Sequence, residues 1–181
     1  IRDQYMRALY TGTTINLSHL ASSVIISLIR QNQMEISKAK FHRTLYLALK
    51  TLHASTNVHL HRSLNWPDRY RGLLDGESME LDRFFSNCKE AELVGQTPDA
   101  YCFLDKLCHD FKRNEVRIEN PVIVYANEVA PIPEVGNAVT SALEMSSTIS
   151  DQDLAFFLFN DEQKAHTWNR DHFSSEPCRE I

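Results

Sequence analysis

Glycine and proline are scarce in this chain, which has 5 Gly and 6 Pro in 181 residues. β-Sandwiches need frequent tight turns and disordered segments are enriched in these residues, so the scarcity argues against both. Hydrophobic residues make up 43% of the chain and charged residues 24%, as is usual for a globular protein. The length favours one domain with an appended tail.

Cysteine motifs for disulfides or zinc are also missing. The four cysteines, Cys88, Cys102, Cys108 and Cys178, include no Cys-x-x-Cys pair and no zinc-ligand spacing. Reduced, buried thiols therefore fit better than disulfides, which indicates a reducing, intracellular compartment. A mitochondrial location and a membrane-associated one both stay open.

No apolar run is long enough to cross a bilayer. The most apolar segment, 17–29, is interrupted by His19 and several serines, and it is shorter than the roughly 20 residues that a transmembrane helix needs. No signal peptide is visible. We therefore expect no transmembrane segment, with peripheral membrane association left open. Because the chain begins with Ile1, we expect a processed product, an excised domain or part of something longer.

The chain has no excess of positive charge. Its formal net charge is −5 and its pI is about 5.9. Binding of nucleic acid usually needs a basic surface, so this charge disfavours it. The helix expected at 99–113 balances three aspartates against three Lys or Arg residues, and its outer face would repel phosphate. Protein contact is therefore expected there rather than contact with DNA.

What the sequence does contain is helical periodicity. Apolar residues recur with the spacing of one helix face in four main segments, at 15–31, 37–52, 79–91 and 99–113. The first segment has the widest apolar stripe, which is typical of a core helix. Ser37 is the expected N-cap of the second.

The stretch 97–127 is predicted to form a helix followed by a β-hairpin. Its triplet Thr97-Pro98-Asp99 combines a hydroxyl N-cap with proline at the first helical position. The expected hairpin strands are 116–118 and the β-branched run 122–125. A helix followed by a hairpin is the back half of a winged helix. The predicted fold class is therefore mainly α, with winged-helix-like packing and an irregular C-terminal tail.

The character of the chain changes after Asn127. Two prolines stiffen the segment 129–134, which predicts an extended connector. We therefore expect a helical, winged-helix-like domain over 1–130. Residues 131–181 are expected to form the connector, short helices and a polar tail that docks on a neighbour.

Five large aromatic side chains stand out near the polar tail: Phe156, Phe157, Phe159, Trp168 and Phe173. Such rings need a surface to cover them, either the body of this chain or a partner subunit. They are the predicted contact residues. The expected partners are other protein subunits or the remainder of a longer chain.

Two histidine patterns are the candidates for chemistry. His59 and His61 would point to one face of a strand, but zinc also needs a third ligand, and after these histidines no carboxylate occurs nearby until Asp68. His166 and Asp171 form a His-x4-Asp pair, in which a histidine can act as general base. This pair lies at the end of the chain without an oxyanion- or phosphate-binding motif, so coincidence is the favoured interpretation. We predict no metal, no cofactor and no catalytic residue.

The order of elements resembles the helical region that follows the catalytic domain of the glycerol-3-phosphate and dihydroxyacetone-phosphate acyltransferases. The matching segments are 10–16, Ser22 with 24–28, 36–41 and 103–127. The resemblance covers about two thirds of the chain, from Tyr10 to Pro131. It implies a non-catalytic helical region of a membrane-associated enzyme of lipid synthesis. The family's catalytic His-x4-Asp lies far upstream of such a region, and its acceptor- and phosphate-binding motifs are absent here.

Three functions follow from these observations. The favoured one is a non-catalytic helical domain or subunit that mediates protein–protein interaction in a larger assembly, including the accessory region of a glycerolipid acyltransferase. The second is a fragment of an acyl-CoA-dependent O-acyltransferase, as the resemblance implies. The third, disfavoured by the acidic charge, is a winged-helix nucleic-acid binder.

Overall fold

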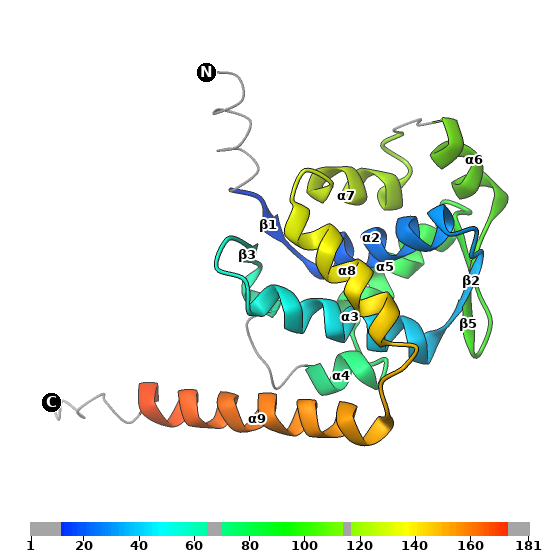
Figure 1. Ribbon diagram of the computed structural model, residues 1–181. Helices are drawn as coiled ribbons and strands as arrows, with labels where there is room; N and C mark the ends of the chain where they lie inside the picture. The colour runs from blue at the N-terminus through cyan, green and yellow to red at the C-terminus, as the bar shows by residue number, and fades with distance from the viewer. Residues whose placement is uncertain (1–11, 65–69, 114–116, 174–181) are drawn as a thin grey trace, which may run out of the picture.

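The computed structural model of the protein describes residues 12–64, 70–113 and 117–173, apart from the side chains of Tyr70 and of 164–173 (Figure 1). In chain order the elements are β1 (Thr14–Ile15), α2 (Leu17–Arg30), β2 (Glu35–Ser37), α3 (Lys38–His53), β3 (His59–Leu60), the 3-10 helix η1 (Arg62–Leu64), α4 (Tyr70–Leu74), α5 (Met79–Glu90), β4 (Val94–Gln96), β5 (Ala100–Phe103), α6 (Asp105–Arg113), α7 (Pro121–Val129), α8 (Pro133–Met145) and α9 (Asp151–Phe173). The chain is mainly helical with small sheets, which confirms the predicted mainly α class.

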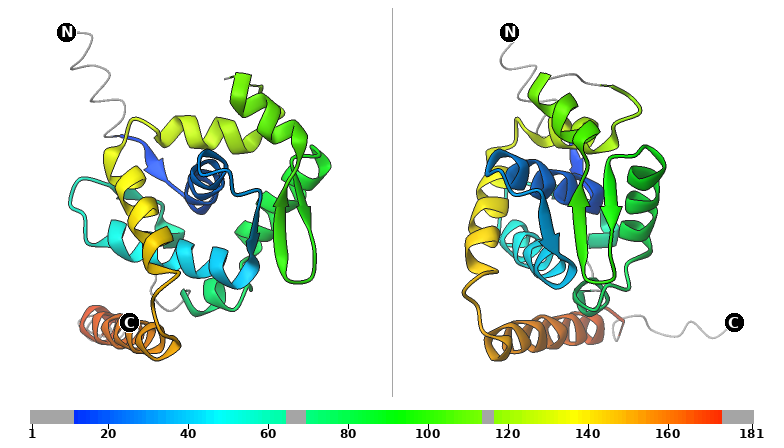
Figure 2. Two further views of the ribbon diagram at one scale, coloured as in Figure 1. Left: turned by 45° about the vertical axis from the view of Figure 1, so that its right-hand side comes forward. Right: turned by 90° about the vertical axis from the view of Figure 1, so that its right-hand side faces the viewer.

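Helix α2 occupies the centre of the fold. Figure 2 shows it nearly end-on, surrounded by α3, α5, α7 and α8, against all of which it packs. Leu20, Val24 and Ile25 on this helix have no exposed surface. Burying one such side chain contributes about 1.5–3 kcal/mol to folding, so the wide apolar stripe places α2 in the core as expected.

Side-chain caps fix where the first two long helices begin. The Asn16 side chain accepts a hydrogen bond from the N–H of His19, and the His19 ring accepts one from the N–H of Asn16. This reciprocal pair satisfies two N–H groups at the start of α2. Ser37 caps α3 by accepting from the N–H of Lys40, which confirms the predicted cap.

Two small sheets flank the helices. β1 and β3 form a parallel pair, while β2, β5 and β4 form an antiparallel sheet in that order. Tyr101 lies opposite Ile36 in this sheet and stacks on Phe85 of α5, with ring centroids 4.0 Å apart. The sheet therefore closes one side of the core.

The predicted position of the hairpin was wrong. It consists of β4 and β5 and precedes helix α6, whereas the expected strand 122–125 is part of α7. Thr97 lies in the hairpin turn, where its N–H donates to the carbonyl of Ala100 over 2.9 Å. The same cap-then-proline signal starts a helix at Asn120–Pro121, and there the Asn120 side chain accepts from the N–H of Ile123.

Two expectations for the C-terminal part also need correction. The predicted connector is short, because α7 ends at Val129 and α8 begins at Pro133. α8, which follows the predicted boundary at 130, packs against α2 and α3. In place of the expected short helices and irregular tail, α9 continues without interruption from Asp151 to Phe173. Residues 162–165 are good helix formers, which favours this continuation.

Among the described residues, no helix combines the length and the apolar character that crossing a bilayer requires. Cys88, Cys102 and Cys108 are free thiols, and Cys178 lies outside the described residues. Burial raises the pKa of the Cys88 thiol to about 12, so it stays protonated at neutral pH.

Candidate functional site

Helix α9 carries the predicted aromatic cluster, and its inner face docks on the body of the same chain. Leu158 is buried, while Leu154 and Phe157 are partly buried against the core. The ammonium group of Lys50 on α3 lies 5.4 Å from the centroid of the Phe157 ring. Figures 1 and 2 show α9 lying across one end of the fold, beside α3 and α4.

Polar bonds fix the rotation of α9 about its axis. The buried Asp161 carboxylate accepts from the hydroxyl of Tyr46 over 2.8 Å and from Nζ of Lys50 over 2.6 Å. Arg71 of α4 donates to both oxygens of Glu162, over 2.9 and 3.2 Å. Charged hydrogen bonds at a buried carboxylate are stronger than neutral ones. The inner face of α9 therefore has one defined orientation.

The opposite side of α9, which we call the outer face, consists of Gln152, Ala155, Phe156 and Phe159. These positions follow the spacing i, i+3, i+4 and i+7, so they share one stripe of the helix. Phe156 is 61% exposed and Phe159 is 56% exposed. The predicted cluster is thus divided, with Phe157 facing inward and the other two rings facing solvent.

The remaining predicted residues of the tail lie beyond the described side chains. The backbone of α9 includes Trp168 and Phe173, as well as His166 and Asp171. Their side chains are outside the described residues, so neither the contact role of the first two nor the pairing of the last two is tested.

The two candidate metal ligands lie in and just after β3. His59 is opposite Thr14 of β1, and its side chain is exposed. Nδ1 of His61 lies 2.7 Å from the hydroxyl of Ser63 and 3.3 Å from its N–H. In the part of the chain that the structure describes, no group of three or more His, Cys, Asp or Glu side chains is arranged to hold a metal ion.

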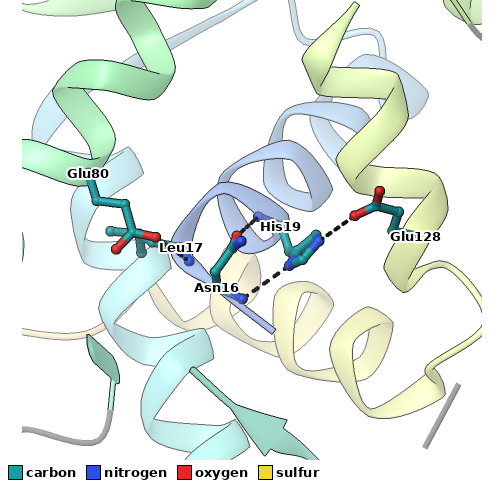
Figure 3. Close-up of polar contacts among 5 residues, drawn as sticks. All are labelled: Asn16, Leu17, His19, Glu80 and Glu128. Atoms are coloured by element: carbon teal, nitrogen blue, oxygen red, sulfur yellow. Dashed lines mark hydrogen bonds and ion pairs between the residues drawn. The ribbon is translucent and has the colours of Figure 1, made fainter. Parts of the chain in front are cut away.

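Sequence reasoning missed a buried polar cluster around His19, which Figure 3 shows. Nδ1 of His19 accepts from the N–H of Asn16 over 3.1 Å, so the proton of the neutral ring lies on Nε2. Nε2 then donates to the carboxylate of Glu128 on α7 over 2.8 Å. The ring of Tyr125 packs edge-on against the imidazole, 5.3 Å between centroids.

A histidine beside a carboxylate is a common general-base arrangement, but here the histidine ring has no nitrogen available to a substrate. Both nitrogens of His19 are already bonded within the protein, and the side chain is 5% exposed. A general base needs a free lone pair within reach of a substrate proton. The arrangement therefore ties the start of α2 to α7. The Asn-x-x-His spacing at 16–19 was the available local signal, whereas nothing local indicated Glu128.

Glu80 of α5 borders a cleft with a volume of about 750 Å³. One of its carboxylate oxygens accepts from the N–H of Leu17 over 3.3 Å (Figure 3). The other accepts from the hydroxyl of Ser63 over 3.4 Å. Glu80 therefore joins α5 to the start of α2.

A second buried histidine, His42, clamps three elements together. Its Nδ1–H donates to the carbonyl of Leu73 over 2.7 Å, so Nε2 accepts from the hydroxyl of Tyr101 over 3.0 Å. Burial lowers the pKa of His42 below its usual value and raises the pKa of Tyr101 to about 12. Both groups are therefore neutral at physiological pH and hold α3, α4 and β5 in place.

Comparison with known proteins returned no match: no family model, curated protein or solved structure is similar to this chain at a significant level.

Proposed function

We propose that this chain is a helical interaction module, a non-catalytic domain or subunit of a larger assembly. It binds another protein subunit through the outer face of α9. The single observation that carries the proposal is the exposure of Phe156 and Phe159 on a helix whose opposite face is bonded to the body of the chain.

The fixed orientation of α9 supports this proposal. The helix cannot turn its two exposed rings inward without breaking the bonds of Asp161 to Tyr46 and Lys50. An exposed aromatic pair remains in contact with water unless a partner covers it, and partner surfaces are enriched in such rings. The outer face thus behaves as a pre-formed helix ligand, with its rings one turn apart.

The chemistry of the outer face indicates the kind of partner. Gln152, Ala155, Phe156 and Phe159 are all uncharged, although the whole chain has a net charge of −5. Binding therefore depends on shape and apolar burial rather than on opposite charge. We expect the partner to present an apolar groove that receives one face of a helix.

Position-specific crosslinking tests the proposal in the cells that produce the protein. A photoreactive amino acid replaces Phe159 in one version and Ile118, which is 92% exposed in a turn after α6, in the control. We expect one defined crosslinked partner from position 159 and none from position 118. The serine substitution Phe156→Ser should reduce both the crosslink and co-purification of that partner at least tenfold.

Native mass gives the second readout. A chain that migrates alone near its own 20.9 kDa, in extracts where crosslinking also returns nothing, would show that the proposal is wrong. Equal crosslinking from positions 159 and 118 would have the same meaning, because it would report random collisions.

The acyltransferase relationship is a narrower form of this proposal, with the remainder of that enzyme as the partner. It rests on the residue pattern of the sequence. The structure contains the helix start at Ser37, but α6 is followed by helix α7 and not by a hairpin. Binding of acyl-CoA by the chain would favour the enzyme alternative. No binding at millimolar acyl-CoA would remove that alternative and leave the interaction module untouched.

A further inference from the structure

A smaller cleft, with a volume of about 220 Å³, lies where α2, α6, α7 and α8 meet. Its apolar walls include Ile26, Ile123 and Val139. The volume corresponds to about seven water molecules of liquid, which suits a small organic molecule and is too small for a nucleotide. This cleft is remote in the chain from the outer face of α9 and shares no residue with it.

One side of the cleft is polar because of a stripe along α2. Ser23, Ser27 and Arg30 follow the spacing i, i+4 and i+7, so they share one face of a helix that is otherwise largely buried. Asn127 of α7 adds an amide. Within the described chain, no side-chain hydrogen bond uses the two serine hydroxyls or this amide.

Arg30 supplies the positive charge of the cleft. Its guanidinium lies over the ring of Phe111, 5.7 Å from the centroid, and it takes part in none of the ion pairs among the described residues. A guanidinium near an aromatic face still has N–H groups available for a carboxylate. Arg30 is therefore a positioned cation without an internal counter-ion.

The start of α8 borders the same cleft. Val135 and Gly136 line it, and the N-cap residue Ile132 provides no side-chain hydrogen bond to the helix. Pro133 has no N–H, and the N–H of Val135 donates to the carbonyl of Ile132 over 3.1 Å, so this helix start contributes only its partial positive charge. Glu134, the acid in this first turn, is not part of the lining.

We propose that this cleft binds a short-chain organic acid, with the carboxylate on Arg30 and the serine hydroxyls and the alkyl part against Ile26 and Val139. The larger cleft near Glu80 is the internal contrast, since its lining includes two carboxylates, Glu77 and Glu80, against one guanidinium, Arg83. Two carboxylates would repel an anion there. We therefore expect a carboxylic acid to bind in the smaller cleft and not in the larger one.

Titration with hexanoate, followed by amide NMR, tests the site. Hexanamide is the matched neutral probe, with the same alkyl part and no charge. We expect hexanoate to bind with a Kd in the millimolar range, as the small number of atoms dictates, and at least tenfold more tightly than hexanamide. The shifted signals should centre on Asn127 and Gly136.

Two substitutions separate the proposal from non-specific binding. Arg30→Met keeps a linear side chain without charge and should weaken hexanoate binding at least tenfold. Lys89→Met, which removes a cation from the last turn of α5, should leave it unchanged. Added salt should weaken binding to the wild-type chain and have little effect on the Arg30 variant.

Gly136→Leu distinguishes loss of the binding site from loss of the fold. A Cβ at Gly136 would meet no atom within 4 Å, and leucine is a better helix former than glycine. The variant should therefore fold with an unchanged or higher Tm and lose hexanoate binding, because its side chain fills the cleft. Equal binding of hexanoate and hexanamide would overturn the proposal. So would full binding by the Arg30 or Gly136 variant, or shifts spread over the surface without saturation.

Discussion

At the scale of single residues, two buried serines in the described part of the chain differ in their hydrogen bonding. The Ser146 hydroxyl accepts from Thr44 over 3.0 Å and donates to the carbonyl of Leu143 over 2.9 Å. The Ser22 hydroxyl, in contrast, is fully buried in α2 and has no hydrogen-bond partner among the described residues. A buried hydroxyl without a partner costs stability.

We therefore predict that Ser22→Ala stabilises the protein. Removing an unpaired hydroxyl and introducing the best helix former should raise the free energy of unfolding by about 0.5–1.5 kcal/mol. Ser146→Ala is the matched control and should lower it by about 1 kcal/mol, since the buried hydrogen bond from Ser146 to the carbonyl of Leu143 is lost. Urea unfolding measures both. A loss of stability in Ser22→Ala comparable to that in the control would mean that the hydroxyl is bonded after all.

At the scale of elements, helix α9 is joined to the body of the protein by ion pairs of very different burial. Asp161 is buried beneath Tyr46 and Lys50, whereas the Asp151 side chain, paired with Arg43 over 2.7 Å, is 89% exposed. Exposed pairs contribute little because water and salt screen them. Asp161 therefore dominates the attachment.

Asp161→Ala should consequently loosen α9 far more than Asp151→Ala. The first removes the hydrogen bond of the buried Tyr46 hydroxyl to Asp161 and the ion pair of Lys50, and should cost about 2–3 kcal/mol, while the second should cost less than about 0.5 kcal/mol. Hydrogen exchange of the α9 amides gives the measurement. Equal exchange rates in the two variants would show that apolar contacts of Leu158 and its neighbours hold the helix without Asp161.

The element scale also shows how far the sequence could be interpreted. The helices with wide apolar stripes and clear caps were predictable, as at Ser37 of α3. Thr97-Pro98 and Asn120-Pro121 carry the same start signal, and only one of them starts a helix. Val122 and Ile123 favour strands by local preference, but both are buried in α7, which packs against α2. Such tertiary packing overrides local propensity.

The candidate site was predictable in composition and unpredictable in geometry. The sequence indicated that the rings at 156–159 need a cover. Which rings face outward depends on the rotation of α9, which Tyr46 and Lys50 determine through Asp161, 115 and 111 residues away in the chain. The bond between His19 and Glu128 likewise spans 109 residues. No local pattern encodes such long-range partners.

At the scale of the whole molecule, the His42 clamp makes overall stability depend on pH. The folded state holds His42 neutral and lowers its pKa, whereas the unfolded chain binds a proton near the ordinary value of 6.5. Below that pH the unfolded state takes up more protons than the folded one. The stabilisation is thus complete above pH 6.5 and is lost as the pH falls towards the lowered pKa.

We therefore expect Tm to fall between pH 7.5 and 5, and His42→Gln to remove part of this dependence while lowering Tm at neutral pH. His59→Gln, at an exposed position in β3, is the control and should keep the wild-type slope. Thermal unfolding followed by circular dichroism over this pH range is sufficient. If Tm changes with pH in His42→Gln as steeply as in the wild type, another titratable group causes the pH dependence.

The central position of α2 has a consequence for how the protein is made. Its main partners, α7 and α8, begin about 100 residues later in the chain. While a ribosome is still synthesising the intervening segments, this core helix can pack only against α3 and α5, and the faces that α7 and α8 later cover stay exposed. Contacts so distant in sequence also slow folding. We expect nascent chains that stop before α8 to be held by chaperones, and a cut anywhere between α2 and α8 to leave two pieces that cannot fold separately.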